Sequence, residues 1–154
     1  MFNIKTIFTP DYERYEGVRP INIYLLRLFY FLMVFFVATD SWRGIITHEG
    51  SWDRFRAMSV CVWAAYTTLA VFGLIHPLRW LPIMIFMIFY KSLWLIIVAY
   101  PLWRANELAG SSAEEMTGAF LGVPLVMIAV PWKYVFENYI YKPKKINERQ
   151  AGLT

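Results

Sequence analysis

The sequence predicts an all-α integral membrane protein in which four transmembrane helices form one bundle. Hydrophobic residues make up 58% of the 154 residues and charged residues only 17%, whereas a soluble domain carries about 25% charged residues. The chain also contains four continuous apolar stretches, each close to the roughly 20 residues that cross the hydrocarbon core of a bilayer as a helix. A chain of this length usually forms one domain, so we expect residues 1–154 to be a single membrane domain.

The four apolar stretches are residues 21–39, 57–75, 81–98 and 119–136, and only Arg27 and Lys91 are charged within them. Apolar residues follow one another continuously instead of alternating, which favours helices over membrane β-strands. Residues 1–20 and 137–154 are then the N-terminal and C-terminal tails, which the orientation argued below places in the cytoplasm.

Local signals predict where three of the helices begin or end. Gly50 is placed to end a first helix that extends beyond the bilayer, and Ser51 then caps the second. Ser112 and Glu115 have capping-box spacing, which starts the fourth helix near Ala113, well before its apolar part. We therefore expect the first, second and fourth helices to project from the membrane.

The distribution of basic residues predicts the orientation. Four crossings place both termini on one side, and that side collects ten Lys and Arg residues against four on the other. Cytoplasmic loops carry the excess of positive charge. The prediction is a multi-pass protein of the bacterial cytoplasmic (inner) membrane with both termini inside. The first twenty residues include acidic residues and no continuous apolar region, so we do not expect them to be a signal peptide.

Lys91 is the most informative single residue. Ten residues of helix separate it from Leu81, which is about 15 Å at 1.5 Å per residue and places it near the middle of the bilayer. A lysine there costs roughly 2.5–3.5 kcal/mol on insertion scales and by default marks a pathway, a binding site or a buried pair. No carboxylate lies inside any apolar stretch to pair with it.

Helical depth suggests which groups surround Lys91. Tyr66 and Thr67 reach the same level on the second helix, Ser92 follows Lys91, and a proline at position 131 leaves the carbonyl of Met127 without its helical donor. One hypothesis is a polar pocket for an anionic head group or a carboxylate. The alternative is structural: Lys91 extends its amine toward the interface or bonds to neighbouring backbone.

Arg27 is a further candidate ligand-binding residue. It lies about 9 Å below the cytoplasmic interface, within reach for simple anchoring. In the alternative role, Arg27 holds a lipid phosphate together with Arg19, Tyr24 and Tyr30, because guanidinium groups match phosphate geometry.

An acidic cluster with one histidine lies on the predicted outer face, at Asp40, His48 and Glu49. Such groups in principle bind a divalent metal or relay protons, but their spacing has no specific signature, and we predict no metal, no cofactor and no catalytic residue. The second histidine, His76, lies in a turn on the opposite side, which excludes a haem bound by two histidines. The lone Cys61 excludes an internal disulfide.

The expected partners are membrane lipids and a second membrane protein or a second copy of the chain. Gly118 and Gly122 have the spacing of close helix contacts in membranes. Nucleic acid is not expected, because the basic charge lies beside the bilayer.

The chain resembles a group of small four-helix bacterial membrane proteins of uncharacterised activity. The resemblance rests on the ordered motifs at 11–15 (DYERY), 23–27 (IYLLR), 89–94 (FYKSLW) and 130–134 (VPWKY). The four-helix layout alone is also loosely similar to the DoxX-like family, although the first helix lacks the glycines associated with that family. Neither resemblance implies an activity.

Three functions remain open from the sequence. The favoured one is a non-enzymatic membrane protein that binds a ligand or a partner, or serves as an accessory subunit, because no convergent catalytic set is present. The second is a small transporter or channel with Lys91 at the midplane. The third is an intramembrane enzyme acting on a lipid, with the outer acidic cluster as its acid and base.

Overall fold

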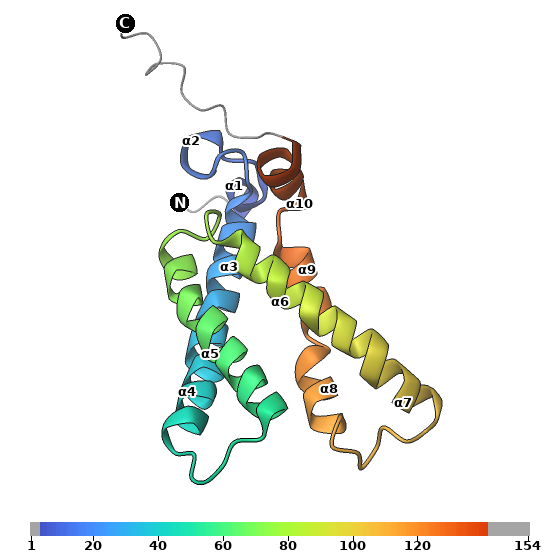
Figure 1. Cartoon of the computed structure of the whole chain (residues 1–154). Coiled ribbons are helices and arrows are strands. Elements are labelled where there is room, and N and C mark those ends of the chain that lie inside the picture. The colour runs from blue at the N-terminus through green and yellow to red at the C-terminus, as the bar shows by residue number, and fades with distance from the viewer. Residues whose placement is uncertain (1–3, 142–154) are drawn as a thin grey trace, which may run out of the picture. The chain divides into compact units, whose positions relative to one another are not determined.

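The computed structural model describes residues 4–141, and these residues form helices joined by short loops (Figure 1). The strand-like pairing in this range is one isolated bridge between Asp11 and Val18. Four basic tail residues of the orientation count, Lys142, Lys144, Lys145 and Arg149, lie outside the described residues. The predicted all-α class is confirmed.

The chain divides into two compact units, one formed by residues 1–20 and 131–154 and the other by residues 21–130. The described helices of the first unit are α1 (Ile4–Phe8), α2 (Tyr12–Tyr15), α10 (Trp132–Val135) and the π-helix η3 (Phe136–Tyr141). The second unit contains α3 (Pro20–Leu32), η1 (Met33–Ala38), α4 (Thr39–Ile46), α5 (Arg54–Ile75), α6 (Leu81–Trp94), η2 (Leu95–Ala99), α7 (Tyr100–Arg104), α8 (Glu114–Phe120) and α9 (Val123–Ala129).

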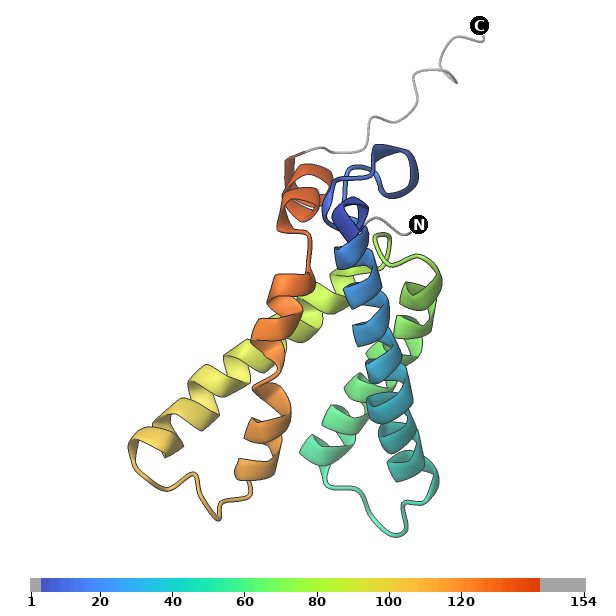
Figure 2. The same ribbon diagram turned by 180° about the vertical axis from the view of Figure 1, so that it is seen from behind.

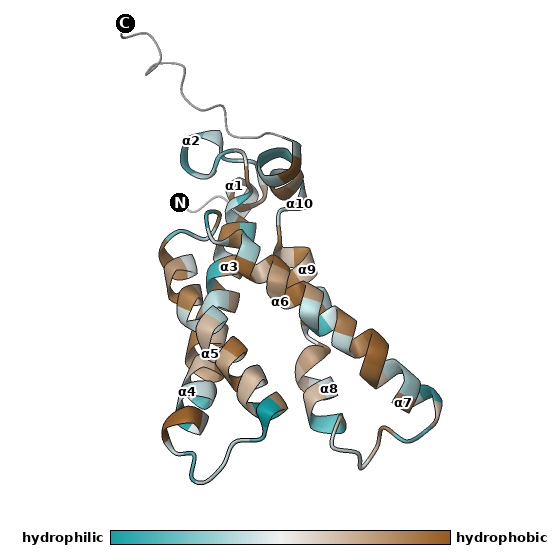
Figure 3. Ribbon diagram, viewed as in Figure 1, coloured by the Kyte–Doolittle hydropathy of each residue, from teal (hydrophilic) through white to brown (hydrophobic). Residues whose placement is uncertain are grey.

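Three helices are long and apolar enough to cross a membrane. They are Pro20–Ile46, Arg54–Ile75 and Leu81–Arg104, with 27, 22 and 24 residues. The first and third pass through the π-helical segments η1 and η2 without a break. Hydrophobic colours cover most of their length in Figure 3. Each is longer than its predicted apolar stretch, by residues 40–46, 54–56 and 99–104 respectively, and each extension contains at least one arginine.

The predicted fourth helix, residues 119–136, is interrupted. Helix α8 ends at Phe120, α9 begins at Val123 with Pro124 in its first turn, and Val130 is extended (φ −69, ψ 126) before Pro131. A proline lacks the N–H that a continuous helix needs and moves the preceding residue out of the helical region. The stretch counts as a fourth candidate span only if the pair Glu114–Ala129 and Trp132–Tyr141 is one broken span.

The predicted helix ends around the α4–α5 loop need correction. Helix α4 ends at Ile46, before Gly50, which lies in the loop with a left-handed backbone (φ 87). Helix α5 is capped by Asp53, whose carboxylate accepts the N–H of Arg56 at 2.8 Å, and not by Ser51. Asp53 is closer to the first apolar turn, so its carboxylate reaches the free backbone donors that Ser51 cannot reach.

The predicted capping box before α8 also does not form. Ala113 occupies the cap position without a side-chain hydrogen bond. The carboxylate of Glu114 instead accepts the N–H of Gly110 at 2.7 Å, and the hydroxyl of Ser111 donates to the carbonyl of Leu108 at 2.7 Å. These bonds close the turn before the helix, so the predicted start near Ala113 is correct although its stated cause is wrong.

The first two long helices pack closely at one point. Figures 1 and 2 show α3, η1 and α4 lying alongside α5. Tyr30 on α3 is fully buried against Gly73 of α5, where an added Cβ would overlap the tyrosine ring. The Tyr30 hydroxyl donates to the carbonyl of Pro77 in the α5–α6 turn at 3.3 Å. Close packing of these helices therefore depends on a glycine at position 73.

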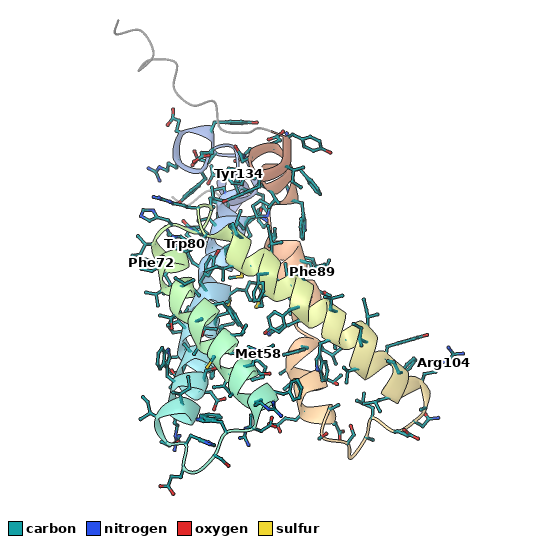
Figure 4. The ribbon with its side chains drawn as sticks, in the orientation of Figure 1. Met58, Phe72, Trp80, Phe89, Arg104 and Tyr134 are labelled. Atoms are coloured by element: carbon teal, nitrogen blue, oxygen red, sulfur yellow. The ribbon has the colours of Figure 1, made fainter. Side chains whose placement is uncertain are left out.

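Two further contacts hold the second unit together. The side-chain amide of Asn22 donates to the carbonyl of Ala129 at the end of α9, at 2.9 Å. Phe72 and Trp80, labelled in Figure 4, stack across the α5–α6 turn with ring centroids 5.1 Å apart. The first contact joins α3 to α9, and the second fixes the turn from which α6 starts.

The first unit contains structure where the sequence analysis expects a tail. Asp11 caps α2 by accepting the N–H groups of Glu13 and Arg14 at 3.2 and 3.0 Å. The hydroxyl of Tyr134 on α10 donates to the carboxylate of Glu16 at 3.0 Å. Residues far apart in the sequence are thus joined within this unit.

Replacing Gly73 by alanine should destabilise the protein by about 1–3 kcal/mol, because overpacking a close contact forces side chains and backbone to shift. Gly118→Ala is the matched control. An added Cβ at Gly118 meets nothing within 4 Å, and alanine is about 1 kcal/mol better than glycine within a helix. Thermal unfolding in detergent compares the two variants. Equal stability of both would contradict the Tyr30–Gly73 contact.

Candidate functional site

Lys91 on α6 has no charged partner in the described part of the chain. Its Nζ lies over the ring of Phe120 on α8, 4.8 Å from the ring centroid. Among residues 4–141 the side-chain amine of Lys91 forms neither an ion pair nor a hydrogen bond. A cation–π contact of this kind contributes about 0.5–2 kcal/mol, which is less than the cost of an intramembrane lysine.

A cavity of about 320 Å³ lies beside Lys91, which we call the lysine cavity. Phe29, Met33 and Phe36 line it from α3 and η1, Met87 from α6, and Val123 and Val126 from α9. Lys91 is the charged member of a lining that is otherwise apolar over the described residues. The cavity combines one positive charge with an apolar wall.

The predicted companions of Lys91 lie elsewhere. The hydroxyl of Tyr66 is 3.0 Å from that of Tyr90. The hydroxyl of Thr67 donates to the carbonyl of Trp63 within its own helix at 2.5 Å. Ser92 is half-buried on α6, and Met127 takes part in another interaction; neither lines the lysine cavity. Of the predicted pocket, only Lys91 lines this cavity.

A chain of aromatic rings connects α5 to α8 across α6. Tyr66 and Tyr90 are 5.8 Å apart between ring centroids, Tyr90 and Phe120 also 5.8 Å, and Trp94 and Phe120 5.2 Å. The Tyr66–Tyr90 hydroxyl pair satisfies two polar groups among these rings. The chain ends at Phe120, the ring that Lys91 contacts.

A larger open cavity of about 740 Å³, here called the arginine cavity, lies between α4, α5, α6 and α8. Asp40, Arg43 and Arg56 line its polar part, and Trp63, Tyr90, Trp94 and Phe120 line its aromatic part. Ser41 also lines it; this residue is 3% exposed, and its buried hydroxyl has no hydrogen-bond partner among residues 4–141. The cavity therefore offers cationic, hydroxyl and aromatic groups together.

Sequence reasoning missed the arginine cavity, although a signal was present. Asp40, Arg43 and Thr47 recur at helical spacing on α4, and Arg56, Ser59 and Trp63 do so on α5. Such spacing places each set on one helix face. The predicted orientation includes Arg43 and Arg56 among the four basic residues of the outer side, and no cavity is predicted around them.

Arg27 is half-buried on α3, and its Nε is buried without a hydrogen-bond partner in the described range. Tyr30, one of its predicted phosphate-binding companions, points its hydroxyl at the carbonyl of Pro77, while Tyr24 is 50% exposed. The hydroxyl of Tyr30 is therefore engaged with the α5–α6 turn, and the phosphate-binding role of Arg27 stays a prediction.

The predicted acidic cluster is spread out. Asp40 lines the arginine cavity, Glu49 is exposed, and the ring of His48 stacks on Trp52 with centroids 3.5 Å apart. Over residues 4–141 no group of three His, Cys, Asp or Glu residues is arranged to hold a metal ion. Asp40 is the member of this cluster that belongs to a cavity.

Comparison with protein-family models, curated proteins and solved structures finds no match to this chain. The function must therefore be argued from the cavities themselves.

Replacing Tyr66 or Tyr90 by phenylalanine tests the hydroxyl pair. Each single change leaves the other hydroxyl without its partner, so the double variant should lose little more stability than either single one. The expected coupling is about 0.5–1.5 kcal/mol, the usual net contribution of a hydrogen bond. Unfolding free energies of the four proteins measure it, and strictly additive losses would show that the pair does not form.

Proposed function

We propose that this chain is an integral membrane protein of the bacterial cytoplasmic membrane. In this proposal the lysine cavity binds an anion with an apolar tail, such as a long-chain carboxylate. The supporting observation is the unpaired Lys91 in an otherwise apolar wall. A charge in hydrocarbon is costly without a partner, and an anionic ligand supplies that partner. The cavity volume of about 320 Å³ is within the range of small-molecule sites.

Binding is favoured over catalysis by what the cavity contains. General acid–base chemistry needs at least one group that exchanges a proton with a reacting atom, held in place by a second polar group. The described lining supplies one amine and no polar side chain that orients it. It supplies charge and shape, which are the requirements for binding.

Removing the charge of Lys91 should abolish binding of a carboxylate with an apolar tail. The measurement is native mass spectrometry of the full chain in neutral detergent with dodecanoate as the probe. Lys91→Met should lose most of the bound ligand, whereas Lys133→Met, which removes an exposed charge outside the cavity, should retain it. Equal binding by wild type and Lys91→Met would refute the proposal.

Lys91→Met should also raise the stability of the ligand-free protein by up to about 3 kcal/mol, because it removes an intramembrane charge without a partner. A residue kept for ligand binding lowers stability in this way. A loss of stability in the same thermal unfolding assay would instead assign Lys91 a structural role.

The proposed orientation places both termini in the cytoplasm. In a Cys61→Ala background, a cysteine at Ser51 in the α4–α5 loop should react with a membrane-impermeant maleimide in intact cells. A cysteine at His76, in the α5–α6 turn, should react only after lysis. The reverse pattern would overturn the orientation.

Transport is the second candidate function, and one observation favours it. Phe120 lines the arginine cavity, and the same ring lies under the amine of Lys91, which lines the lysine cavity. A solute that moves from one cavity to the other would have to pass the ring of Phe120. Ligand flux into vesicles containing the purified protein would support this candidate over binding alone.

A further inference from the structure

We propose that the arginine cavity is a second ligand site, separate from Lys91, for an amphiphile with a phosphate head group. The phosphate lies between Arg43 and Arg56, and the apolar tail lies along the aromatic wall. The lysine cavity has neither arginines nor hydroxyl groups in its described lining, so the two sites differ in the chemistry they recognise.

The two arginines provide the anion site. They project from adjacent helices, Arg43 from α4 and Arg56 from α5, and both line the cavity. Within residues 4–141 neither guanidinium forms an ion pair or a side-chain hydrogen bond. Two like charges facing one cavity repel each other unless an anion lies between them, and the guanidinium fork matches phosphate oxygens in pairs.

Ser41 supplies independent evidence for a polar ligand. Its side chain is 3% exposed and lines the cavity, yet its buried hydroxyl has no partner in the described chain. A buried hydroxyl without a hydrogen bond is destabilising. Rotation of this side chain about its Cα–Cβ bond would present the hydroxyl to a phosphate oxygen in the cavity that Arg43 and Arg56 also line.

The aromatic wall explains why the ligand needs an apolar tail. Trp63, Tyr90, Trp94 and Phe120 form one side of the cavity. A free phosphate would leave this surface unused, whereas an acyl chain would remove it from water. Burial of apolar surface contributes about 25 cal/mol per Å², so the tail should add substantially to the affinity.

Asp40 is the opposing charge in the cavity. It is exposed and lies one helical turn before Arg43 on the same face of α4. The two arginines outnumber it, so an anion is still favoured. Because Asp40 repels a phosphate, Asp40→Asn should strengthen phosphate binding.

The test uses three probes on the full chain in neutral detergent, with affinity measured by native mass spectrometry. Lysophosphatidic acid has both phosphate and tail, the matching monoacylglycerol has only the tail, and glycerol 3-phosphate has only the phosphate. Lysophosphatidic acid should bind at least about tenfold more tightly than either of the others, a difference of about 1.4 kcal/mol. Equal binding of glycerol 3-phosphate, or of monoacylglycerol, would overturn the proposal.

Two double variants locate the site. Arg43→Gln/Arg56→Gln should weaken lysophosphatidic acid binding at least about tenfold, because both charge-assisted contacts are lost. Arg54→Gln/Arg104→Gln removes two exposed arginines that do not line the cavity and should change binding less than about twofold. A similar loss in both variants would assign the binding to diffuse surface charge and overturn the site.

Two further variants test the remaining contacts. Ser41→Ala should weaken binding about threefold to tenfold, the size of one ordinary net hydrogen bond. Arg43→Lys/Arg56→Lys keeps the charge but loses the paired donors, so its affinity should fall between wild type and the glutamine variant. Binding by the glutamine variant equal to wild type, in protein with an unchanged unfolding temperature, would refute the inference.

Discussion

The contact between Tyr30 and Gly73 sets the geometry of the helices that surround both cavities. The ring of Tyr30 is fully buried, and it approaches α5 at a residue without a Cβ. Its hydroxyl reaches past α5 to the carbonyl of Pro77, in the turn that leads into α6. One side chain thus fixes the spacing of α3 and α5 and anchors the turn from which α6 starts. The depth of Lys91 relative to η1 follows from that anchor, because helix rise is constant.

The sequence predicts the three long helices because length and hydrophobicity alone define them. At the fourth, residues 119–136, it predicts one continuous helix, whereas Pro124 and Pro131 interrupt a stretch that is equally apolar. Pro131 predicts a carbonyl without its helical donor at Met127, but an apolar stretch cannot show whether a proline bends a helix or ends it. The extended backbone of Val130 shows that the helix ends there. The cap of α5 is misplaced for a related reason, since Ser51 and Asp53 are both residue types that cap helices and only the backbone geometry selects Asp53.

The candidate sites were predictable only in part. The number of residues from a helix end gives depth, which identified Lys91 as unusual, but depth does not give the direction of a side chain around its helix. Tyr66 and Thr67 share the expected level of Lys91, yet one bonds to Tyr90 and the other to its own backbone. Predicting the arginine cavity requires a different observation, namely that polar residues recur at helical spacing on α4 and on α5. The structure shows that both sets line one cavity.

Two polar groups lack a hydrogen-bond or ion-pair partner among residues 4–141, namely the amine of Lys91 and the hydroxyl of Ser41, and each belongs to a residue that lines one of the two cavities. In apolar surroundings an unsatisfied polar group lowers stability, and folding alone gives no reason to keep it. Sequences depart from local stability rules mainly where function requires it. The two groups differ in chemistry, a cation beside aliphatic and aromatic side chains and a hydroxyl beside two guanidinium groups. Phe120 lines the arginine cavity, and its ring contacts the amine of Lys91 in the lysine cavity, so this ring is the point at which the two groups of residues meet.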